Sequence, residues 1–337
     1  MSQAKADLPK TIRAVTLTGA GGPEVLRLSE LPCPRPGPGQ VLIAVRAAGV
    51  NRPDIAQREG RYPVPPDASP VPGLEVAGHI AALGDGVDGL AVGQQVCALV
   101  HGGGYASHAL ADAGTVMPVP DGISLEQPAA LPEVALTVEF NMMQRAALRG
   151  GETVLIHGGS SGIGSHAIER AKAQGGTVIT TAGNAAKCAY CRDLGADLAI
   201  NYHEQDFVAE TLSFTSGRGA DVVLDMVGGD YVSRNLQALA ADGRYALISL
   251  QGGRHIAADL EPLLRRRLSL IGSTLRPLPP ARKAALAADV IQQVWPLVAG
   301  GQIRPRIFQS FPLEQVAQAH ALMDSGQHMG KIVLTLD

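Results

Sequence analysis

Residues 153–183, TVLIHGGSSGIGSHAIERAKAQGGTVITTAG, decide the fold of this chain. An apolar run over 153–156 leads into a glycine-rich turn, a helical segment follows, and a second apolar run occupies 177–181. A strand, a glycine turn, a helix and a strand within about thirty residues is the arrangement that places a pyrophosphate at a helix N-terminus. The sequence therefore predicts a dinucleotide site that begins in mid-chain, after roughly 150 residues with another role.

Strands and helices continue to alternate after this stretch. Strands are expected at 153–156, 177–181, 198–201, 221–225, 243–248 and 268–272, and helices at 162–174, 185–194, 205–214 and 231–240. Six strands joined by helical crossovers predict a doubly wound parallel sheet, the α/β Rossmann architecture. After it we expect a helix at 281–298, a short strand pair near 303–311, a helix at 313–323 and a last strand at 331–336.

The part of the chain before this sheet has a different pattern. Short apolar strands broken by Pro and Gly run from residue 11 to about 120, and the clearest are 12–17, 41–45, 75–83 and 95–100. Such strands predict an antiparallel β-rich domain that is partly barrel-like. The stretch 126–148 then has apolar residues at three- or four-residue spacing, which predicts a helix.

The composition suits two domains and excludes some classes of partner. At 337 residues the chain exceeds one ordinary core, and a hydrophobic fraction of 46% is enough to fill two. A net charge of −3 gives no footprint for nucleic acid or an anionic membrane, and no run approaches the about 18 apolar residues of a membrane span. The scattered cysteines fit a reducing compartment, and Cys188 and Cys191 fall within one predicted helix, which indicates a structural role. We therefore expect a cytoplasmic protein.

The spelling of the glycine turn resembles that of short-chain dehydrogenases as much as any other family. That family would place the turn near its N-terminus and carry a Tyr-x-x-x-Lys pair for proton transfer. None of the six tyrosines of this chain has a lysine four residues later. The short-chain interpretation therefore fails on both counts.

A nucleotide fold behind a β-rich N-terminal domain resembles instead the medium-chain dehydrogenase/reductase superfamily, over essentially the whole chain. The segment GVNRPD at 49–54 looks like that family's first active-site loop, GLEVAG at 73–78 like its second, and GKIVL at 330–334 like its C-terminal strand. The resemblance implies a GroES-like catalytic domain at 1–130, a Rossmann domain at 131–276, and a segment at 277–337 that returns to the catalytic domain.

Zinc-dependent members of that superfamily use a Cys in the first loop and a His in the second, because thiolate and imidazole bind Zn²⁺ tightly. Here Asn51 stands at the Cys place and Leu74 at the His place, and no four-cysteine structural lobe is present. We expect a zinc-free enzyme with no metal ligands. This loss makes the chain similar to the zinc-independent quinone oxidoreductase (zeta-crystallin-like) branch.

The end of the second strand predicts which nicotinamide cofactor binds. NAD enzymes carry an acidic residue about twenty positions past the glycine turn, which accepts from the ribose hydroxyl. Here the strand ends without Asp or Glu, Gly183 leaves room, and Lys187 supplies a positive charge, so NADPH is favoured over NADH. An ordinary solvated position is the alternative for Lys187.

The cofactor-binding set combines the turn with positions implied by the resemblance. The turn contributes Gly158, Gly159, Ser160, Ser161, Gly162, Ile163 and Gly164. The resemblance implies that Tyr202 packs on the phosphate-ribose region, that Thr137 approaches the nicotinamide amide, that Lys331 lies near the cofactor, and that the nicotinamide face is lined by Leu250, Gly252, Ser273, Thr274 and Leu275.

Without a metal or an acid–base pair, the simplest chemistry is hydride transfer to an acceptor that is already electrophilic, such as a quinone or a conjugated carbonyl. Asn51 is the first candidate to donate a hydrogen bond to the acceptor oxygen or to orient the nicotinamide, and Tyr62 could donate a phenol proton. The structural alternative is that Asn51 is only a turn residue before Pro53 and that Tyr62 only packs against its neighbours. The final proton can come from water, so we expect no single essential catalytic acid.

Two other functions stay open beside an NADPH-dependent quinone reductase. One is a 2-enoyl thioester or enone reductase, which would need a basic groove for coenzyme A phosphates; Arg265-Arg266-Arg267 is the only basic run. The other is a non-enzymatic NADPH-binding protein. The strand at 268–273 would be an exposed apolar edge, and the resemblance implies a homodimer joined there.

Overall fold

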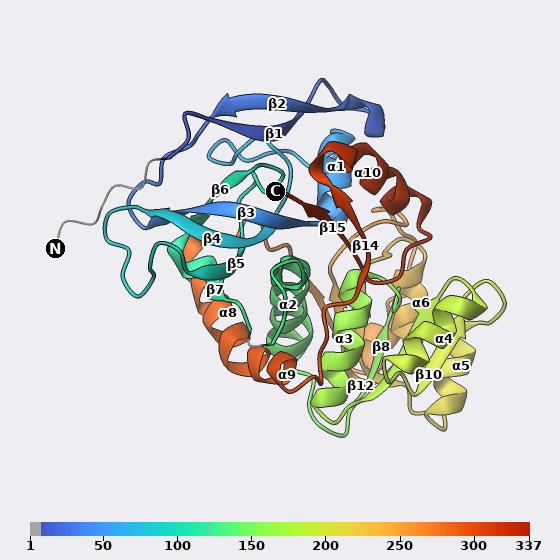
Figure 1. Cartoon of the computed structure of the whole chain (residues 1–337). Coiled ribbons are helices and arrows are strands. Elements are labelled where there is room, and N and C mark those ends of the chain that lie inside the picture. Colours follow the sequence, from blue (N-terminus) through green and yellow to red (C-terminus); the bar gives the residue numbers. More distant parts are fainter. Residues whose placement is uncertain (1–7, 121) are drawn as a thin grey trace. The chain divides into compact units, whose positions relative to one another are not determined.

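The computed structural model describes residues 8–120 and 122–337, which divide into two units (Figure 1). Unit 1 contains the described residues up to Val134 together with Leu278–Ala299 and Pro305–Asp337. Unit 2 contains Ala135–Pro277 and Gly300–Arg304. Each unit has its own sheet and its own buried core.

Unit 2 is built on a six-stranded sheet in which every strand pair is parallel, in the order β10-β9-β8-β11-β12-β13. The prediction of a doubly wound Rossmann sheet is therefore confirmed. The strands are β8 (Thr153–Ile156), β9 (Thr177–Ala182), β10 (Leu198–Asn201), β11 (Ala220–Asp225), β12 (Leu239–Leu247) and β13 (Ser269–Gly272). The helices are α3 (Gly162–Ala173), α4 (Ala185–Asp193), α5 (Phe207–Phe214), α6 (Tyr231–Ala238) and α7 (Glu261–Arg265).

Both faces of this sheet are covered by helices, and successive residues of one strand serve opposite faces. Val154 and Ile156 pack in one cluster with residues of α3 and α4, whereas Leu155 between them packs in another with residues of α5 and α6. This alternation is the two-residue period of a strand buried on both sides. It explains why β8 is a continuous buried run, mostly of apolar residues.

Unit 1 contains a seven-stranded sheet in the order β14-β15-β3-β4-β5-β7, with β6 paired to β3, and a separate β1-β2 hairpin. Its strands are β1 (Thr11–Leu17), β2 (Leu26–Pro32), β3 (Gln40–Val50), β4 (Glu75–Leu83), β5 (Gln95–Leu99), β6 (His108–Asp112), β7 (Val116–Pro118), β14 (Ile307–Pro312) and β15 (Lys331–Thr335). All pairs are antiparallel except β14 with β15. The β-rich domain is thus confirmed, and the last strand of the chain pairs with β3.

Three expectations about the remaining elements were wrong. The stretch 126–148 is a 3₁₀ turn at Gln127–Ala130, α2 (Pro132–Val138) and a π-helix at Glu139–Arg145, rather than one helix. The helix expected at 281–298 is divided into α8 (Pro280–Gln293) and α9 (Trp295–Ala299), because Pro296 has no N–H to continue the helical bonding. The strand pair near 303–311 is a single strand, β14, which finds its partner in β15.

Two short helices of unit 1, α1 (Arg52–Arg58) and α10 (Val316–Ser325), contact each other. Helix α1 follows β3 directly, within the segment that resembles an active-site loop, and no helix was predicted there. Helix α10 follows a 3₁₀ turn and lies within the predicted range 313–323 except at its C-terminal end. Helix α10 also packs against β14 and β15.

Candidate active site

The glycine turn of unit 2 leaves no room for side chains. A Cβ on Gly159 would lie 2.0 Å from Oγ1 of Thr180, and one on Gly164 would lie 2.2 Å from the carbonyl oxygen of Gly158. Gly158 itself has φ of +67°, a conformation that side-chain-bearing residues avoid. Ser161 caps α3 by accepting the N–H of Gly164 at 3.0 Å. The bare backbone at this helix N-terminus is the cradle that a pyrophosphate needs, so these residues fit a dinucleotide.

A buried hydrogen-bond network supports the turn from behind. His157 Nε2 lies 2.7 Å from Oδ1 of Asn235, which can only accept, so the ring proton is on Nε2. Nδ1 then accepts the hydroxyl of Thr181 at 3.0 Å, and Oγ1 of Thr181 accepts the N–H of Gly158 at 3.3 Å. Burial keeps the pKa of His157 below its ordinary value, although Asp225 opposes this. A neutral imidazole therefore ties β8, β9 and α6 together beneath the turn, a role that we did not predict.

The end of β9 has the features expected for a 2′-phosphate site. Tyr202 lies against Gly183, since a Cβ there would be 2.7 Å from the phenol oxygen. Asn184 caps α4 by accepting the N–H of Lys187 at 2.9 Å, which places that lysine in the first turn. Burial lowers the pKa of Lys187, and Cys191 partly offsets this effect. A glycine, a phenol and a lysine are thus gathered at a strand end that has no carboxylate between 182 and 187.

Two of the predicted nicotinamide-side residues, Thr137 and Ser273, are linked by one residue that sequence reasoning missed. Asn141 donates from Nδ2 to the carbonyl of Thr137 at 2.9 Å, and its Oδ1 accepts the hydroxyl of Ser273 at 2.5 Å. Asn141 is buried in the π-helix, so the π-helix joins α2 to the segment after β13. Thr274 and Leu275 continue that segment, and Leu250 and Gly252 belong to a loop that contacts Gly228 and Gly229.

In unit 1, three side chains from distant parts of the chain meet at the start of the sheet. The ammonium of Lys331 lies 2.6 Å from Oε1 of Glu75 and 2.5 Å from Oδ1 of Asn51. Asn51 Nδ2 donates to the same Glu75 oxygen at 2.8 Å. All three side chains are buried. The structure therefore brings together two predicted site residues, Asn51 and Lys331, around a carboxylate that we did not single out.

Most hydrogen-bond donors and acceptors of the Asn51, Glu75 and Lys331 side chains are engaged with one another or with nearby backbone. Asn51 directs its Nδ2 to Glu75 and to the carbonyl of Gly49, and its Oδ1 accepts from Lys331. Lys331 also lies 3.4 Å from the carbonyl of Val50, which gives its ammonium three acceptors. An ammonium has three donors, so these contacts account for all of them. The arrangement can fix the end of β3 and the start of α1 more readily than it can donate to a substrate.

Asp54 holds the same loop from the other side. Its Oδ2 accepts the N–H of Asn51 at 2.8 Å and the hydroxyl of Tyr105 at 3.0 Å, and its Oδ1 accepts the N–H of Gly73 at 3.2 Å. Burial raises the pKa of Asp54 to about 6, while these hydrogen bonds and the charge of Lys331 pull it down. Asp54 thereby connects the two segments that resemble active-site loops.

Glu133 is the other ionisable group beside the triad. It lies at the start of α2, and its N–H donates to Oε2 of Glu75 at 2.9 Å. Most of this residue is shielded from solvent. Burial raises the pKa of Glu133 to about 8, repulsion from Glu75 and Asp54 adds to the shift, and Lys331 opposes it. The carboxyl group is therefore mostly protonated at neutral pH and can donate a proton.

Tyr62 follows α1, whereas Asn51 precedes it. The N–H of Tyr62 bonds to the carbonyl of Ala56 at 3.1 Å, which folds the segment after the helix back along it. The side chain is half-buried. The two predicted catalytic residues thus lie at opposite ends of a seven-residue helix.

At the two positions that the resemblance matches to zinc ligands, the side chains are an amide and an alkyl group, in place of a thiolate and an imidazole. Leu74 is buried and Asn51 is engaged with Glu75 and Lys331. Across residues 8–120 and 122–337, no group of three or more His, Cys, Asp or Glu is arranged to hold a metal ion. Cys188 and Cys191 lie in α4, where both are buried and free of disulfides.

Two family models match the chain. Residues 37–121 match the alcohol dehydrogenase GroES-like domain, and residues 194–334 match zinc-binding dehydrogenase. Together with the two sheets described above, these matches confirm a GroES-like domain combined with a Rossmann domain.

Curated proteins and solved structures give similarity over nearly the full length. The quinone oxidoreductase of Rattus norvegicus is 33% identical over 97% of this chain and 98% of its own. The phthioceranic/hydroxyphthioceranic acid synthase of Mycobacterium tuberculosis is 32% identical over 89% of this chain, but over only 14% of its own length. A mycobacterial protein whose structure was solved in complex with NADPH superposes with a TM-score of 0.87 at 29% identity, over 96% of this chain and 100% of that one.

Proposed function

The chain belongs to the quinone oxidoreductase branch of the medium-chain dehydrogenase/reductase superfamily, and from that membership we propose that it reduces quinones or related conjugated carbonyls with NADPH and without a metal. The observation that carries the proposal is the similarity to a quinone oxidoreductase from end to end. Asn51 and Leu74 at the zinc positions support the metal-free chemistry. The chain is an oxidoreductase, and the choice of acceptor is the proposed part.

NADPH is the cofactor that unit 2 fits. The glycine cradle at 158–164 accommodates a pyrophosphate, and the similar mycobacterial protein was solved with NADPH. At the far end of the nucleotide, Gly183, Lys187 and Tyr202 offer space, charge and a ring to a 2′-phosphate, whereas a carboxylate there would repel it.

The protein's own contribution is positioning and proton supply. NADPH supplies the hydride, and a quinone or enone spreads the negative charge that develops on its oxygen. We propose that the triad of Asn51, Glu75 and Lys331 keeps the first active-site loop rigid. Glu133, protonated at neutral pH, and the phenol of Tyr62 are the candidate proton donors to that oxygen, with water as the third source.

The thioester alternative is disfavoured by the state of the only basic run. Arg265 pairs with Glu261 at 2.5 Å, and Arg267 pairs with Asp242 through two hydrogen bonds of 2.8 and 2.7 Å. Arg266 donates to backbone carbonyls, including that of Leu239 at 2.6 Å. The two ion pairs are exposed, where a pair is worth no more than about 1 kcal/mol, so an arrangement of paired surface charges explains this run without a coenzyme A site.

A substrate panel tests the proposal. NADPH oxidation is followed with benzoquinones, naphthoquinones, small enones and 2-enoyl thioesters. Faster turnover of quinones supports the proposed function, faster turnover of thioesters supports the alternative, and NADPH binding without any turnover supports a non-enzymatic protein.

Asn51→Ala and Tyr62→Phe are each expected to retain more than about one ten-thousandth of kcat, because a larger loss would exceed what general acid–base catalysis provides.

We also propose a homodimer joined through the edge of the parallel sheet. Strand β13 is the last strand in the sheet order, and Leu270 on it is 52% exposed. Leu260 and Leu264, just before β13, are exposed as well. An apolar strand edge of this kind is normally paired or covered. Separately, none of the helices in the described part of the chain has the length and apolar content needed to cross a bilayer; a cytoplasmic location remains a proposal.

A further inference from the structure

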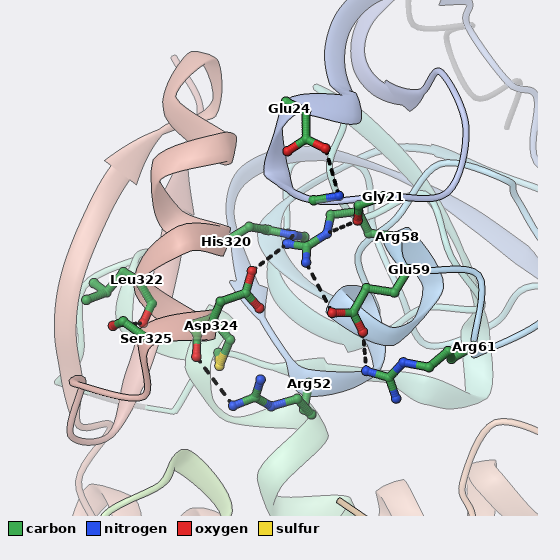
Figure 2. A network of polar contacts seen from close by, with 12 residues as sticks. Gly21, Glu24, Arg52, Arg58, Glu59, Arg61, His320, Leu322, Asp324 and Ser325 are labelled. Atoms are coloured by element: carbon green, nitrogen blue, oxygen red, sulfur yellow. Dashed lines mark hydrogen bonds and ion pairs between the residues drawn. The ribbon is translucent and has the colours of Figure 1, made fainter.

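Arg58, the last residue of α1, is only 2% exposed although it carries a permanent charge. Its guanidinium lies between α1 and α10 (Figure 2). Nη1 is 3.0 Å from Oδ2 of Asp324, Nε donates to the carbonyl of Gly21 at 3.0 Å, and Nη2 is 3.4 Å from Oε1 of Glu59. The cation is therefore compensated on three sides, and its orientation is fixed.

This orientation determines the proton position on a buried histidine. Arg58 Nη1 lies 3.4 Å from Nδ1 of His320, and a guanidinium nitrogen can only donate. Burial, together with the charge of Arg58, lowers the pKa of His320 to about 3, so the ring is neutral near neutral pH. Nδ1 accepts, and the single ring proton must be on Nε2.

Hydrogen-bond donation continues in the same direction from His320 to Tyr105 and from Tyr105 to Asp54. His320 Nε2 lies 3.3 Å from the phenol oxygen of Tyr105, and their rings meet edge to face with centroids 5.7 Å apart. Because Nε2 is the donor, the hydroxyl proton of Tyr105 is left for Oδ2 of Asp54 at 3.0 Å. The series Arg58, His320, Tyr105, Asp54 thus has one direction of donation throughout. It ends on the carboxylate that accepts the N–H of Asn51.

The same series cannot conduct protons to solvent. Its first member is an arginine, which does not release its proton in proteins, and His320 is too buried to take up a second proton near neutral pH. What it can do is favour the ionised form of Asp54, since a donor directed at a carboxylate stabilises the charge. Hydrogen bonds in such a chain also polarise one another.

We propose that Arg58, His320 and Tyr105 form a one-way hydrogen-bond chain that keeps Asp54 ionised under Asn51, which makes His320 of α10 a positioning residue for the active-site loop. The inference rests on the proposed function, because that function makes the loop part of the site. It assigns the C-terminal helix a role in activity: α10 supplies His320 and Asp324, and Arg52 of α1 also donates to α10 through the carbonyl of Met323 at 3.3 Å (Figure 2).

The pH dependence follows from the charges that surround Asp54. The ammonium of Lys331, the carboxyl of Glu133 and the phenol of Tyr105 interact with it directly. Glu75 acts on it through Lys331 and Tyr105, and Arg58 acts through Tyr105. When Asp54 takes up a proton, it no longer accepts equally from Asn51, Tyr105 and Gly73, so activity is expected to fall as pH drops through about 6. Removing a donor to the carboxylate raises that midpoint.

The test compares kcat/KM from pH 5 to 9 in three variants with the wild type. In Tyr105→Phe the acid limb is expected to move up by about one pH unit, which gives roughly a fivefold loss at pH 6 and almost none at pH 8. His320→Leu should move the limb in the same direction by less, with roughly a twofold loss at pH 6. His320→Gln keeps an acceptor and a donor and should restore the wild-type midpoint. His79→Leu is the control, because His79 is a half-buried histidine on β4 that takes no part in the hydrogen-bond chain.

The double variant Tyr105→Phe/His320→Leu is expected to match Tyr105→Phe alone, because His320 acts through Tyr105. Losses that multiply, or a loss of the same size at every pH, would overturn the proposal. The pKa of Asp54 is read independently by ¹³C NMR of carboxyl-labelled protein, where it should rise in Tyr105→Phe. If the wild type reduces no quinone or enone but the Asp54 titration shifts as expected, the proposed function is wrong and the proposed hydrogen-bond chain is supported. If the titration does not shift, the proposed hydrogen-bond chain is wrong, whatever the substrate.

Discussion

Lys331 Nζ lies 2.6 Å from Oε1 of Glu75, although 256 positions separate the two residues and each begins an apolar strand. Their side chains are 5% and 0% exposed. Removing one partner of such a pair leaves an uncompensated buried charge, which is far more costly than the pair itself is stabilising. The ion pair therefore adds a side-chain link between the starts of β15 and β4 to the backbone pairing of β15 with β3.

Lys331→Met is expected to lower the free energy of unfolding by about 3–5 kcal/mol, because Glu75 would be left buried without its cation. Denaturant unfolding of the purified protein measures the loss. Lys331→Arg keeps a charge and should lose less. Lys172→Met is the control: Lys172 pairs with Asp197 at 2.9 Å near the surface, and its removal should cost no more than about 1 kcal/mol. Equal losses at the two lysines would show that the buried pair has no special weight.

The glycine turn gives a second prediction. Gly159→Ala should weaken NADPH binding at least a hundredfold, because the new Cβ would lie 2.0 Å from Oγ1 of Thr180 and force the turn out of shape. Adding Thr180→Ala removes that oxygen and should recover part of the affinity. Gly19→Ala, where nothing lies within 4 Å, serves as the matched control. The measurement is quenching of protein fluorescence by NADPH; undiminished binding in Gly159→Ala would contradict the role of the turn.

Cofactor preference gives a third. Lys187→Met is expected to reduce NADPH affinity about tenfold and to leave NADH affinity unchanged, since only the former carries a 2′-phosphate. Asn184→Asp keeps the cap that accepts the N–H of Lys187 and adds a negative charge beside Gly183, so it should shift the preference in the same direction. Isothermal titration with both cofactors measures the effect. A loss of NADH affinity as large as that of NADPH would assign Lys187 a structural role.

The parallel sheet could be predicted because its information is local. Strands β8 to β11 are short, mostly apolar segments that are each followed by a helix, and the glycine turn lies between β8 and α3, so pattern and order were sufficient. Elements set by proline or by distant pairing were not predictable in this way. Helix α1 has only seven residues and begins with Arg52-Pro53, and β14 finds its partner in a strand more than twenty positions later.

The candidate site likewise has one part formed by residues close in sequence and one part formed by residues far apart in sequence. The proposed cofactor cradle consists of neighbouring residues, so its members could be proposed from the sequence. The ion pair of Glu75 and Lys331 and the link from Asp54 to Tyr105 depend on how β3, β4 and β15 are registered, which no local pattern encodes. An acidic and a basic residue, each placed in an apolar strand, was the available signal, because such charges are buried only when paired.

The edge of the parallel sheet gives a fourth prediction. Leu270→Lys should convert the proposed dimer into a monomer, because a charge would enter an apolar strand edge that pairs with its copy. Sedimentation velocity measures the change in mass. Phe308→Lys, at an exposed apolar residue on β14 in the other unit, should leave the mass unchanged. A monomeric wild type would refute the dimer directly.

The last prediction concerns the proton donor. Burial raises the pKa of Glu133 to about 8, so its carboxyl is protonated below that pH and loses its proton above it. If it donates the proton to the reduced acceptor, kcat/KM should fall as pH rises through about 8. Glu133→Gln keeps the shape and the backbone bond to Glu75 but has no acidic proton, so the alkaline limb should vanish and kcat/KM at pH 7 should fall about a hundredfold.

NADPH affinity in Glu133→Gln should stay unchanged, which separates a lost proton from a damaged fold. Glu126→Gln, at an exposed position a few residues earlier, is the control and should keep the wild-type profile. An alkaline limb that persists in Glu133→Gln would assign that limb to another group. Full activity at pH 7 without the carboxyl would instead leave Tyr62 or water as the source of the proton, in keeping with chemistry that depends on no single acid.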